Sequence, residues 1–406
     1  MKQVPQPQAL SIYLVAAEES GDALGAALAH ALVERAGGAL RLAGVGGQAM
    51  AAAGIASPFA IDDLSILGLT AIPRRLPTIL RRIRETTAAI VAGRPDALVI
   101  VDSPDFTHRV ARRVRRTAPS IPIIDYVSPS VWAWRPGRAR AMRAYVDCVL
   151  AILPFEPAVY RRLGGPACVY VGHPLTQRLA ELRPNAEEAE RRRADPPLVL
   201  VLPGSRASEI RRLLAIFGAA IARTVAAAGP MQLVLPTVSH LLPRVRAGVS
   251  GWAVKPRIVV EPAEKWAAFR SARAALAASG TVTLELAVAG IPTVAAYRLS
   301  LVEEMALRIL SPQPRPHSVI LANLVLGENV IPEFLQRDCT PHRLADALVP
   351  LLSDTPQRLR QVDAFGGLDR IMAPGATAAS AMAAAIVLDM ARHGRRDLAA
   401  GAIGEN

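Results

Sequence analysis

Hydrophobic and polar residues are grouped along this chain in alternating blocks. Short runs of aliphatic and β-branched residues recur, and segments long enough for a helix separate them. This order is typical of parallel strands joined by crossover helices, and it predicts an α/β fold. The predicted strands form two series, 11–17, 40–45, 97–102, 121–127, 148–153 and 167–171, followed by 198–203, 231–236, 257–261, 274–278 and 291–297. We therefore expect two facing, doubly wound, Rossmann-like domains with parallel sheets.

A charged segment separates the two series. Residues 183–197, "RPNAEEAERRRADPP", end in two prolines, and this composition is typical of a linker. We expect an N-terminal domain at 1–182 and a C-terminal domain at 198–340. Residues 341–406 are rich in Ala and Leu and predict a helical tail, which either packs back on the first domain or is exchanged in a dimer.

Composition narrows the class of protein. A chain of 406 residues suits two domains, and no apolar run reaches the length of a membrane-spanning helix. The formal net charge of +13 indicates an anionic partner, while an aromatic content of only 4% argues against single-stranded nucleic acid. The three cysteines are Cys148, Cys168 and Cys339. Because their number is odd and they lie far apart, we expect neither disulfides nor a zinc site, and we expect the protein to be in the reducing cytoplasm. Because the seven histidines are scattered, we expect no metal site.

Polar residues follow the first predicted strand, at the edge where parallel sheets bind ligands. They are Glu18, Ser20, Gly21 and Asp22. Acidic residues in the first turn of a helix are stabilised by the helix dipole, so a structural role is open for them. Gly21 equally allows a ligand to approach the backbone.

Two aspartates follow the strand predicted at 97–102. Asp102 is placed where a general base acts, and burial would raise its basicity. Asp105 either joins the binding site or caps the next helix. Binding of loop amides is the structural alternative for Asp102.

Two turns in the second half have features of phosphate-binding loops. "LPGSR" (202–206) offers the amides of Gly204 and Ser205 and the guanidinium of Arg206 at a helix start. "SGTVTLE" (279–285) repeats this order with Ser279, Gly280 and Thr281, and Glu285 lies one turn further, where a carboxylate accepts hydrogen bonds from a ribose. Together they indicate a nucleotide site; separately, each is an ordinary strand-to-helix turn.

A third glycine pattern, "GVGGQA" (44–49), matches the dinucleotide fingerprint G-x-G-x-x-A. It follows the second predicted strand instead of the first, so we consider a nicotinamide site improbable. The sequence contains no G-x-x-x-x-G-K-[ST] pattern, which excludes a P-loop.

The segment 64–85 combines apolar residues at helical spacing with interleaved arginines. This pattern suits a helix lying at a membrane surface, although burial of one face against the sheet explains it too. The residues predicted to contact the membrane are Ile66, Leu67, Leu69, Ile72 and Leu76.

The stretch "YVSPSVWAWRPGR" (126–138) holds two of the four tryptophans of the chain. Trp132 and Trp134 either line an acceptor site or only pack their loop, and Arg135 with Arg138 offers charge for a phosphate. With the other motifs, this stretch makes the chain resemble lipid-A-disaccharide synthase, a bacterial glycosyltransferase family of the GT-B fold. The motifs that carry the resemblance are "EESGD" (18–22), "GVGG.AM" (44–50), "ILG" (66–68), "VDSPDF" (101–106), "LPFE" (153–156), "VGHPL" (171–175), "LPGSR" (202–206), "SGT...E" (279–285) and "NLVLGENVIPEFLQ" (323–336).

The resemblance implies a reaction. UDP-2,3-diacylglucosamine donates its sugar to the 6-hydroxyl of 2,3-diacylglucosamine 1-phosphate (lipid X), giving a β-1,6-linked lipid A disaccharide 1-phosphate and UDP with inversion. It implies Asp102 as the base, Glu285 on the ribose, and Asn323 reaching the site from a loop. It also implies no cofactor, a peripheral location on the cytoplasmic face of the anionic inner membrane, no nucleic acid, and a homodimer through the tail.

Two departures and two alternatives accompany the resemblance. Ala17 and Ala322 replace a glycine and a proline that the family usually has. A UDP-sugar epimerase of the same fold would share the nucleotide contacts. A basic, non-catalytic peripheral membrane-binding protein would explain the charge and the segment 64–85.

Overall fold

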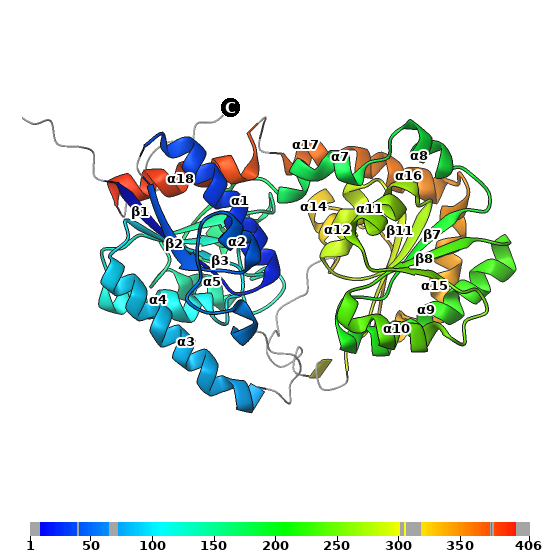
Figure 1. Cartoon of the computed structure of the whole chain (residues 1–406). Coiled ribbons are helices and arrows are strands. Elements are labelled where there is room, and N and C mark those ends of the chain that lie inside the picture. The colour runs from blue at the N-terminus through cyan, green and yellow to red at the C-terminus, as the bar shows by residue number, and fades with distance from the viewer. Residues whose placement is uncertain are drawn as a thin grey trace, which may run out of the picture. The chain divides into compact units, whose positions relative to one another are not determined.

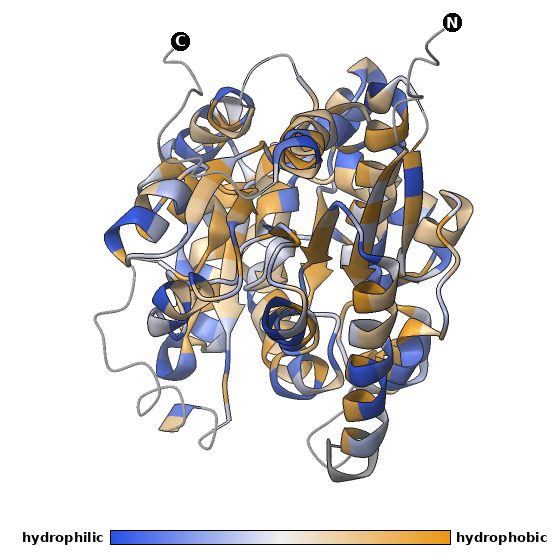
Figure 2. Ribbon diagram, turned by 90° about the vertical axis from the view of Figure 1, so that its left-hand side faces the viewer, coloured by the Kyte–Doolittle hydropathy of each residue, from blue (hydrophilic) through white to orange (hydrophobic). Residues whose placement is uncertain are grey.

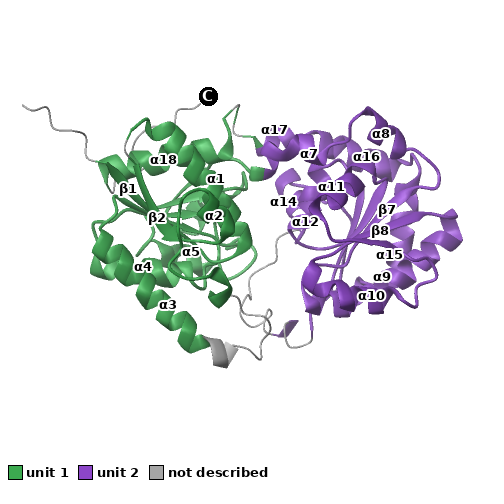
Figure 3. Ribbon diagram, in the orientation of Figure 1, with its two compact units in different colours: residues 1–174, 373–406 green, residues 175–372 purple. Residues whose placement is uncertain are grey.

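The computed structural model describes residues 9–38, 40–64, 72–300, 304–305, 318–373, 375 and 377–394, with the side chains of helix α3 described from Leu76 onward. The chain divides into two compact units (Figures 1 and 3). Unit 1 comprises Met1–Pro174 and Ala373–Asn406, and unit 2 comprises Leu175–Met372. The chain therefore leaves unit 1, builds unit 2 and returns.

Unit 1 contains a six-stranded parallel sheet in the order β2-β1-β3-β4-β5-β6. The strands are β1 (Leu10–Ala16), β2 (Leu40–Val45), β3 (Ala97–Val101), β4 (Ile123–Tyr126), β5 (Cys148–Ala151) and β6 (Ala167–Tyr170). Its helices are α1 (Glu19–Ala36), α2 (Gln48–Ala52), α3 (Ile72–Gly93), α4 (Thr107–Thr117), α5 (Gly137–Met142), α6 (Glu156–Arg162) and α18 (Ala379–His393), with the 3₁₀ helix η1 at Ile61–Leu64. Chain order reverses between β1 and β3.

Unit 2 repeats the plan with the order β12-β11-β10-β7-β8-β9, also parallel. The strands are β7 (Leu198–Leu202), β8 (Gln232–Pro236), β9 (Arg257–Val259), β10 (Ala274–Ala278), β11 (Thr293–Tyr297) and β12 (Glu333–Leu335). The helices are α7 (Leu179–Leu182), α8 (Ala186–Arg191), α9 (Ala207–Ala228), α10 (Leu242–Val249), α11 (Pro262–Ser271), α12 (Thr281–Val288), α14 (Leu321–Leu326), α15 (Pro341–Leu348), α16 (Pro356–Gly366) and α17 (Leu368–Met372), with 3₁₀ turns at Pro174–Arg178, Ser239–Leu241, Gln336–Asp338 and Val349–Leu352. Here the order reverses between β7 and β10.

Burial explains the length and composition of the strands. In β3 all five residues are buried, as expected for a parallel strand covered by helices on both faces. In Figure 2 the strands are mostly in hydrophobic colours, while the helices carry hydrophilic residues as well. Each sheet has its own hydrophobic core, which makes the two units separate domains. The predicted α/β class, with two doubly wound parallel sheets, is confirmed.

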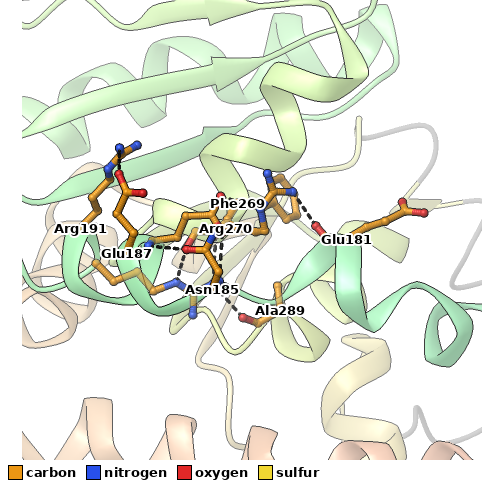
Figure 4. Close-up of polar contacts among 9 residues, drawn as sticks. Glu181, Asn185, Glu187, Arg191, Phe269, Arg270 and Ala289 are labelled. Atoms are coloured by element: carbon orange, nitrogen blue, oxygen red, sulfur yellow. Dashed lines mark hydrogen bonds and ion pairs between the residues drawn. The ribbon is translucent and has the colours of Figure 1, made fainter.

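The segment predicted as a linker, 183–197, is structured and lies within unit 2. Asn185 and Glu188 form a capping box at the start of α8, and Arg270 of α11 binds the Glu188 carboxylate at 2.8 Å. Arg270 also donates to the Glu181 carbonyl at 2.9 Å (Figure 4). The Arg192 guanidinium donates to the carbonyls of Arg270, Phe269, Ala289 and Gly290 at 2.7–3.3 Å. The chain instead crosses between the units at 174–175 and 372–373.

The tail predicted at 341–406 is divided between the two units. Residues 341–372 form helices of unit 2, with α15 packing on α9. Helix α18 belongs to unit 1, where it packs against α1, β1 and β3 (Figure 1). Its buried residues join the core of the first sheet, among them Ala383, Ala384 and Val387.

Candidate functional site

Asp102 lies at the carboxyl end of β3, at the reversal of chain order in unit 1. The Ser20 hydroxyl donates to its carboxylate at 3.4 Å, which joins the ends of β1 and β3. Gly21 packs closely here, since a β-carbon at this position would lie 3.2 Å from the Val101 carbonyl oxygen, a tight contact, and 3.7 Å from the Asp102 β-carbon. Glu18 and Ser20 are exposed at the same edge. The predicted residues after β1 and β3 are therefore brought together.

The backbone at Asp102 has an uncommon conformation. Asp102 and Ser103 have φ angles of 51° and 46°, in the left-handed region that non-glycine residues seldom occupy. Such residues cost about 1–3 kcal/mol each and concentrate at functional sites. Asp105 is exposed, and no side chain caps α4, so the capping alternative for Asp105 is not seen.

Asp22 has a structural role that differs from the predicted contact with substrate. Its side chain is 5% exposed, and its carboxylate accepts hydrogen bonds from the amides of Gly47, Ala49 and Met50 at 2.7–3.0 Å. These amides belong to the "GVGGQA" turn and the start of α2. A protein carboxylate thus occupies the position that a phosphate would take in a dinucleotide fold.

The tryptophan loop follows β4 and is partly packed on unit 1. The ring of half-buried Trp132 meets the ring of Phe155 edge-on, with centroids 5.6 Å apart. The guanidinium of exposed Arg135 lies 4.9 Å from the centroid of the half-buried Trp134 ring. Trp132 therefore packs against Phe155, while Arg135 is exposed beside Trp134.

Glu156, in the "LPFE" motif behind this loop, was not predicted as a site residue. It is 2% exposed and accepts a hydrogen bond from the Leu153 amide at 3.0 Å. Burial raises its pKa to about 7, although the Leu153 amide and the side chains of Ser128 and Trp132 act in the opposite direction. A carboxyl that titrates near neutral pH thus lies beneath the loop.

A cavity of about 410 Å³ opens in unit 2 where chain order reverses. This size is within the usual range for small-molecule sites. Its lining residues are Leu202, Gly204, Ser205, Arg206, Glu209, Pro236, Thr237, Val238, Lys265, Ala278, Ser279, Gly280, Thr281, Val282 and Glu285. The two predicted turns meet here because β10 pairs directly with β7. Seven of the eight residues predicted to bind the donor line this cavity.

The amides of the "LPGSR" turn are already bound. Glu209 of α9 accepts from the amides of Ser205 and Arg206 at 3.0 and 3.1 Å. Gly204 has φ of 114°, and a β-carbon there would lie 2.2 Å from the Glu209 carboxylate, so only glycine fits. The Arg206 side chain remains 77% exposed. This turn offers the Arg206 side chain, and not the Ser205 and Arg206 amides, to an anion.

The start of α12 is different. Gly280 is its N-cap, no side chain caps it, and Thr281 is exposed in the cavity. The first amides of this helix and the positive end of its dipole are therefore directed at the cavity.

Glu285 lines the cavity one turn into α12. Its carboxylate binds the Lys265 ammonium at 3.0 Å, with 20% and 29% of the two side chains exposed. Lys265 also lies 4.0 Å from the centroid of the Trp266 ring. Lys265 was not among the predicted site residues, although lysine is rare in this chain, which contains only Lys2, Lys255 and Lys265.

Asn323 does not reach the cavity, so its predicted contact with the donor is wrong for this structure. It lies in α14 instead of a loop and is 0% exposed. Its amide group donates to the Ser318 hydroxyl and the Ile331 carbonyl, and accepts from the amides of Val330 and Ile331, at 2.8–3.2 Å. All four of its hydrogen-bonding positions are used within unit 2.

The segment predicted to contact a membrane is only partly described. Ile66, Leu67 and Leu69 lie outside the described residues, as does the side chain of Ile72. Leu76 is 42% exposed on α3, whereas Ile83 of that helix is buried. No described helix combines the length and apolar character needed to cross a bilayer. Among all the residues that the structure describes, no group of three His, Cys, Asp or Glu side chains is arranged to hold a metal ion.

Known structures share the fold at low sequence identity. The UDP-GlcNAc 2-epimerase from Neisseria meningitidis bound to UDP-GlcNAc matches with a TM-score of 0.57 and 10% identity, covering 94% of this chain and 99% of that one. The MurG structure from Acinetobacter baumannii matches with a TM-score of 0.56 and 16% identity, covering 94% and 100%.

Sequence comparison is more specific. A lipid-A-disaccharide synthase of Rhodopseudomonas palustris (strain HaA2) is 59% identical over 382 residues, which are 94% of this chain and 96% of that protein. The enzyme of that name from Rhodospirillum centenum is 42% identical, covering 94% of both chains. The family model described as lipid-A-disaccharide synthetase matches residues 12–387. The chain belongs to the lipid-A-disaccharide synthetase family.

Proposed function

We propose that this protein is the inverting glycosyltransferase that joins UDP-2,3-diacylglucosamine to 2,3-diacylglucosamine 1-phosphate. The product is the β-1,6-linked lipid A disaccharide 1-phosphate, and UDP is released. Membership of the family supports this reaction. The uncapped start of α12, with Glu285 in the same cavity, is the observation that carries the assignment of the donor site.

The donor diphosphate binds at the start of α12. Three strand-to-helix turns had phosphate-binding patterns, and in two of them a carboxylate already holds the amides, Asp22 in one and Glu209 in the other. Only the turn at Gly280 and Thr281 is left without a side-chain cap. Arg206, exposed at the same cavity, supplies a guanidinium for the phosphate oxygens.

Glu285 holds the ribose of the donor. A carboxylate accepts hydrogen bonds from two neighbouring hydroxyls, and these charge-assisted bonds are stronger than neutral ones. The contact with Lys265 at 3.0 Å orients the Glu285 carboxylate in the cavity. Pro236, Thr237 and Val238 line the remaining wall and provide contacts for the uracil ring.

Asp102 removes the proton from the 6-hydroxyl of the acceptor while the oxygen of that hydroxyl attacks the anomeric carbon of the donor sugar. The bond from that carbon to the diphosphate oxygen breaks on the opposite side, so the configuration inverts. Negative charge then grows on the departing UDP, where the α12 amides and Arg206 stabilise it. Arg135, over Trp134, is a candidate for the acceptor phosphate.

Unit 1 also provides the proposed contact with the anionic inner membrane. Exposed Leu76 inserts among the lipids, and arginines of α3 contact the headgroups. A homodimer formed by exchange of the tail would move α18, which in this structure packs in the core of its own unit 1, into the partner.

The direct test is disaccharide formation in detergent micelles from a labelled lipid monosaccharide phosphate and its UDP-activated form. Asp102→Asn should lower kcat by about 100-fold or more, because a general base contributes about that factor. UDP affinity, measured by calorimetry, should not change, because Asp102 is in unit 1 and the donor cavity is in unit 2.

Two outcomes would contradict the assignment. Lack of product from folded wild type, with conversion of UDP-GlcNAc instead, would favour the epimerase alternative. Undiminished product from Asp102→Asn would keep the reaction and remove Asp102 as its base. Glu34→Gln is the control, since Glu34 is exposed on α1, away from the turn that carries Asp102.

A further inference from the structure

The turn that carries Asp102 is held by two hydrogen bonds from different elements. The Asp102 amide donates to the Tyr126 carbonyl at the end of β4, at 3.0 Å. The Thr107 hydroxyl, at the start of α4, donates to the Asp102 carbonyl at 2.7 Å. Because Asp102 and Ser103 have positive φ, the turn depends on such contacts to keep its conformation.

The sequence neighbours of these two residues are joined to each other. Asp125 directly precedes Tyr126, and His108 directly follows Thr107. The His108 Nε2 atom lies 3.2 Å from the Asp125 carboxylate, and the two side chains are 5% and 0% exposed. One buried contact therefore connects β4 to α4, the two elements that hold the Asp102 backbone.

The contact extends to a third side chain. The other ring nitrogen of His108 lies 3.0 Å from the Tyr145 hydroxyl, and the two rings meet edge-on with centroids 5.7 Å apart. Arg112 donates to the same hydroxyl at 3.2 Å from one turn further along α4. The imidazole thus has a hydrogen-bond partner at Nδ1 and a carboxylate oxygen 3.2 Å from Nε2, so groups on both sides of the ring limit its orientation.

Stability alone does not account for this pair. Two buried polar side chains in contact are often no more stabilising than apolar residues of similar size, because the loss of hydration offsets their attraction. Burial raises the pKa of Asp125, and His108 opposes this effect. Unlike an apolar contact, this polar contact depends on the distance and orientation of the two side chains. It therefore fixes the spacing of β4 and α4 at this point.

We propose that Asp125 and His108 are positioning residues for Asp102, acting as a clamp between β4 and α4. This role rests on the proposed function of Asp102 as the base, but the clamp itself can be measured without any reaction. A misplacement of about 1 Å at a reacting group can lower a rate by about 100-fold.

Hydrogen exchange of native protein, followed by mass spectrometry of peptides spanning 99–110, measures the clamp. In His108→Leu the amides of Asp102, Phe106 and Thr107 should exchange about tenfold faster or more, because their hydrogen bonds belong to this turn. Asp125→Asn keeps an oxygen acceptor for His108 and should have a smaller effect.

Gln361→Leu is the matched control. Gln361 is 2% exposed and ties α16 to β11 in unit 2 through both backbone groups of Thr293. Its loss should destabilise the protein without changing exchange in 99–110. Unchanged exchange in His108→Leu, or equal acceleration in Gln361→Leu at the same loss of Tm, would overturn the clamp.

Kinetics then connect the clamp to the reaction. His108→Leu should lower kcat for disaccharide formation by about 10- to 100-fold while KM for the UDP donor stays within about twofold. Faster exchange with unchanged kcat would overturn the positioning role. If wild type forms no disaccharide, the proposed function fails, and the exchange data still decide whether the clamp exists.

Discussion

Individual carboxylates in this protein have distinct tasks that their surroundings determine. Asp22 and Glu209 bind backbone amides and fix turns, whereas Glu285 faces a cavity and is paired with Lys265. Glu156 is buried and titrates near neutral pH. Two of these residues allow predictions at the scale of a single side chain.

Replacing Glu285 should weaken UDP binding through the ribose. Glu285→Gln loses the charge-assisted hydrogen bonds, and we expect a Kd about tenfold higher by calorimetry. With 2′,3′-dideoxy-UDP the wild type and the variant should bind alike, because the hydroxyls are absent. Glu264→Gln, at an exposed position on α11, is the control. Equal affinity of Glu285→Gln and wild type for UDP would remove Glu285 from the ribose site.

Glu156 should make stability depend on pH near neutrality. Its pKa is raised in the folded protein to about 7, so the folded state binds this proton more tightly than the unfolded state does. The stabilisation is complete below the unfolded pKa of about 4.3 and is lost as pH rises through about 7. The free energy of unfolding, measured with urea, should decrease between about pH 5 and about pH 8, and this decrease should be larger for wild type than for Glu156→Gln. A Glu156→Gln variant with the same pH dependence as wild type would contradict this prediction.

At the scale of elements, helix α8 and the residues that follow it anchor the start of unit 2. Arg192 alone contacts four carbonyl oxygens, from the ends of α11 and α12. Burial lowers its pKa to about 10, which reflects how far the guanidinium is removed from water. The segment therefore acts as a structural brace, although its composition suggested a linker.

Removing this brace should destabilise unit 2. Arg192→Leu leaves several carbonyl groups without donors, and a loss of about 2 kcal/mol or more in the free energy of unfolding is expected. The neighbouring Arg193 is exposed, and Arg193→Leu should change stability by less than about 0.5 kcal/mol. Similar urea midpoints for both variants would show that 183–197 is a linker after all.

The sequence predicted regular elements well and local hydrogen bonding poorly. Eleven strands were expected from their apolar runs, and each run overlaps a strand; β12 was missed because Glu333–Leu335 is too short to show a pattern. Most of the motif residues predicted at the strand ends of the second half line the cavity of unit 2. The roles of Asp22, Glu209 and Asn323 could not be predicted from the sequence. Their side chains bind backbone amides that either are distant in the sequence or could equally well bind a phosphate. Lys265 and the Asp125–His108 pair depend on contacts between elements, which single-sequence patterns do not contain.

For the whole molecule, the net charge of +13 is its main long-range property. The proposed lipid substrates and the inner membrane surface are anionic, so attraction should assist the approach of the protein to both. Screening by salt limits this effect to short distances.

Binding to vesicles should consequently depend on salt and on Leu76. Co-sedimentation with anionic phospholipid vesicles should fall as salt is raised from about 0.01 M to about 1 M, where the screening length drops from about 30 Å to about 3 Å. Leu76→Ser should weaken binding at every salt concentration, since part of the contact is apolar. Leu359→Ser, on α16 of unit 2 and 53% exposed, is the control. Equal binding of the two variants would place the membrane contact elsewhere.

The return of the chain to unit 1 has a consequence for synthesis on the ribosome. Helix α18 supplies Val387 and Leu388 to the core beneath β1 and β3, so that core is incomplete until almost the entire polypeptide has been made. Unit 2, which is continuous from Leu175 to Met372, contains all its strands before α18 emerges. The first unit to be translated is therefore the last to reach its native packing, and an early stop codon anywhere before α18 would leave an apolar surface of unit 1 open to chaperones and proteases.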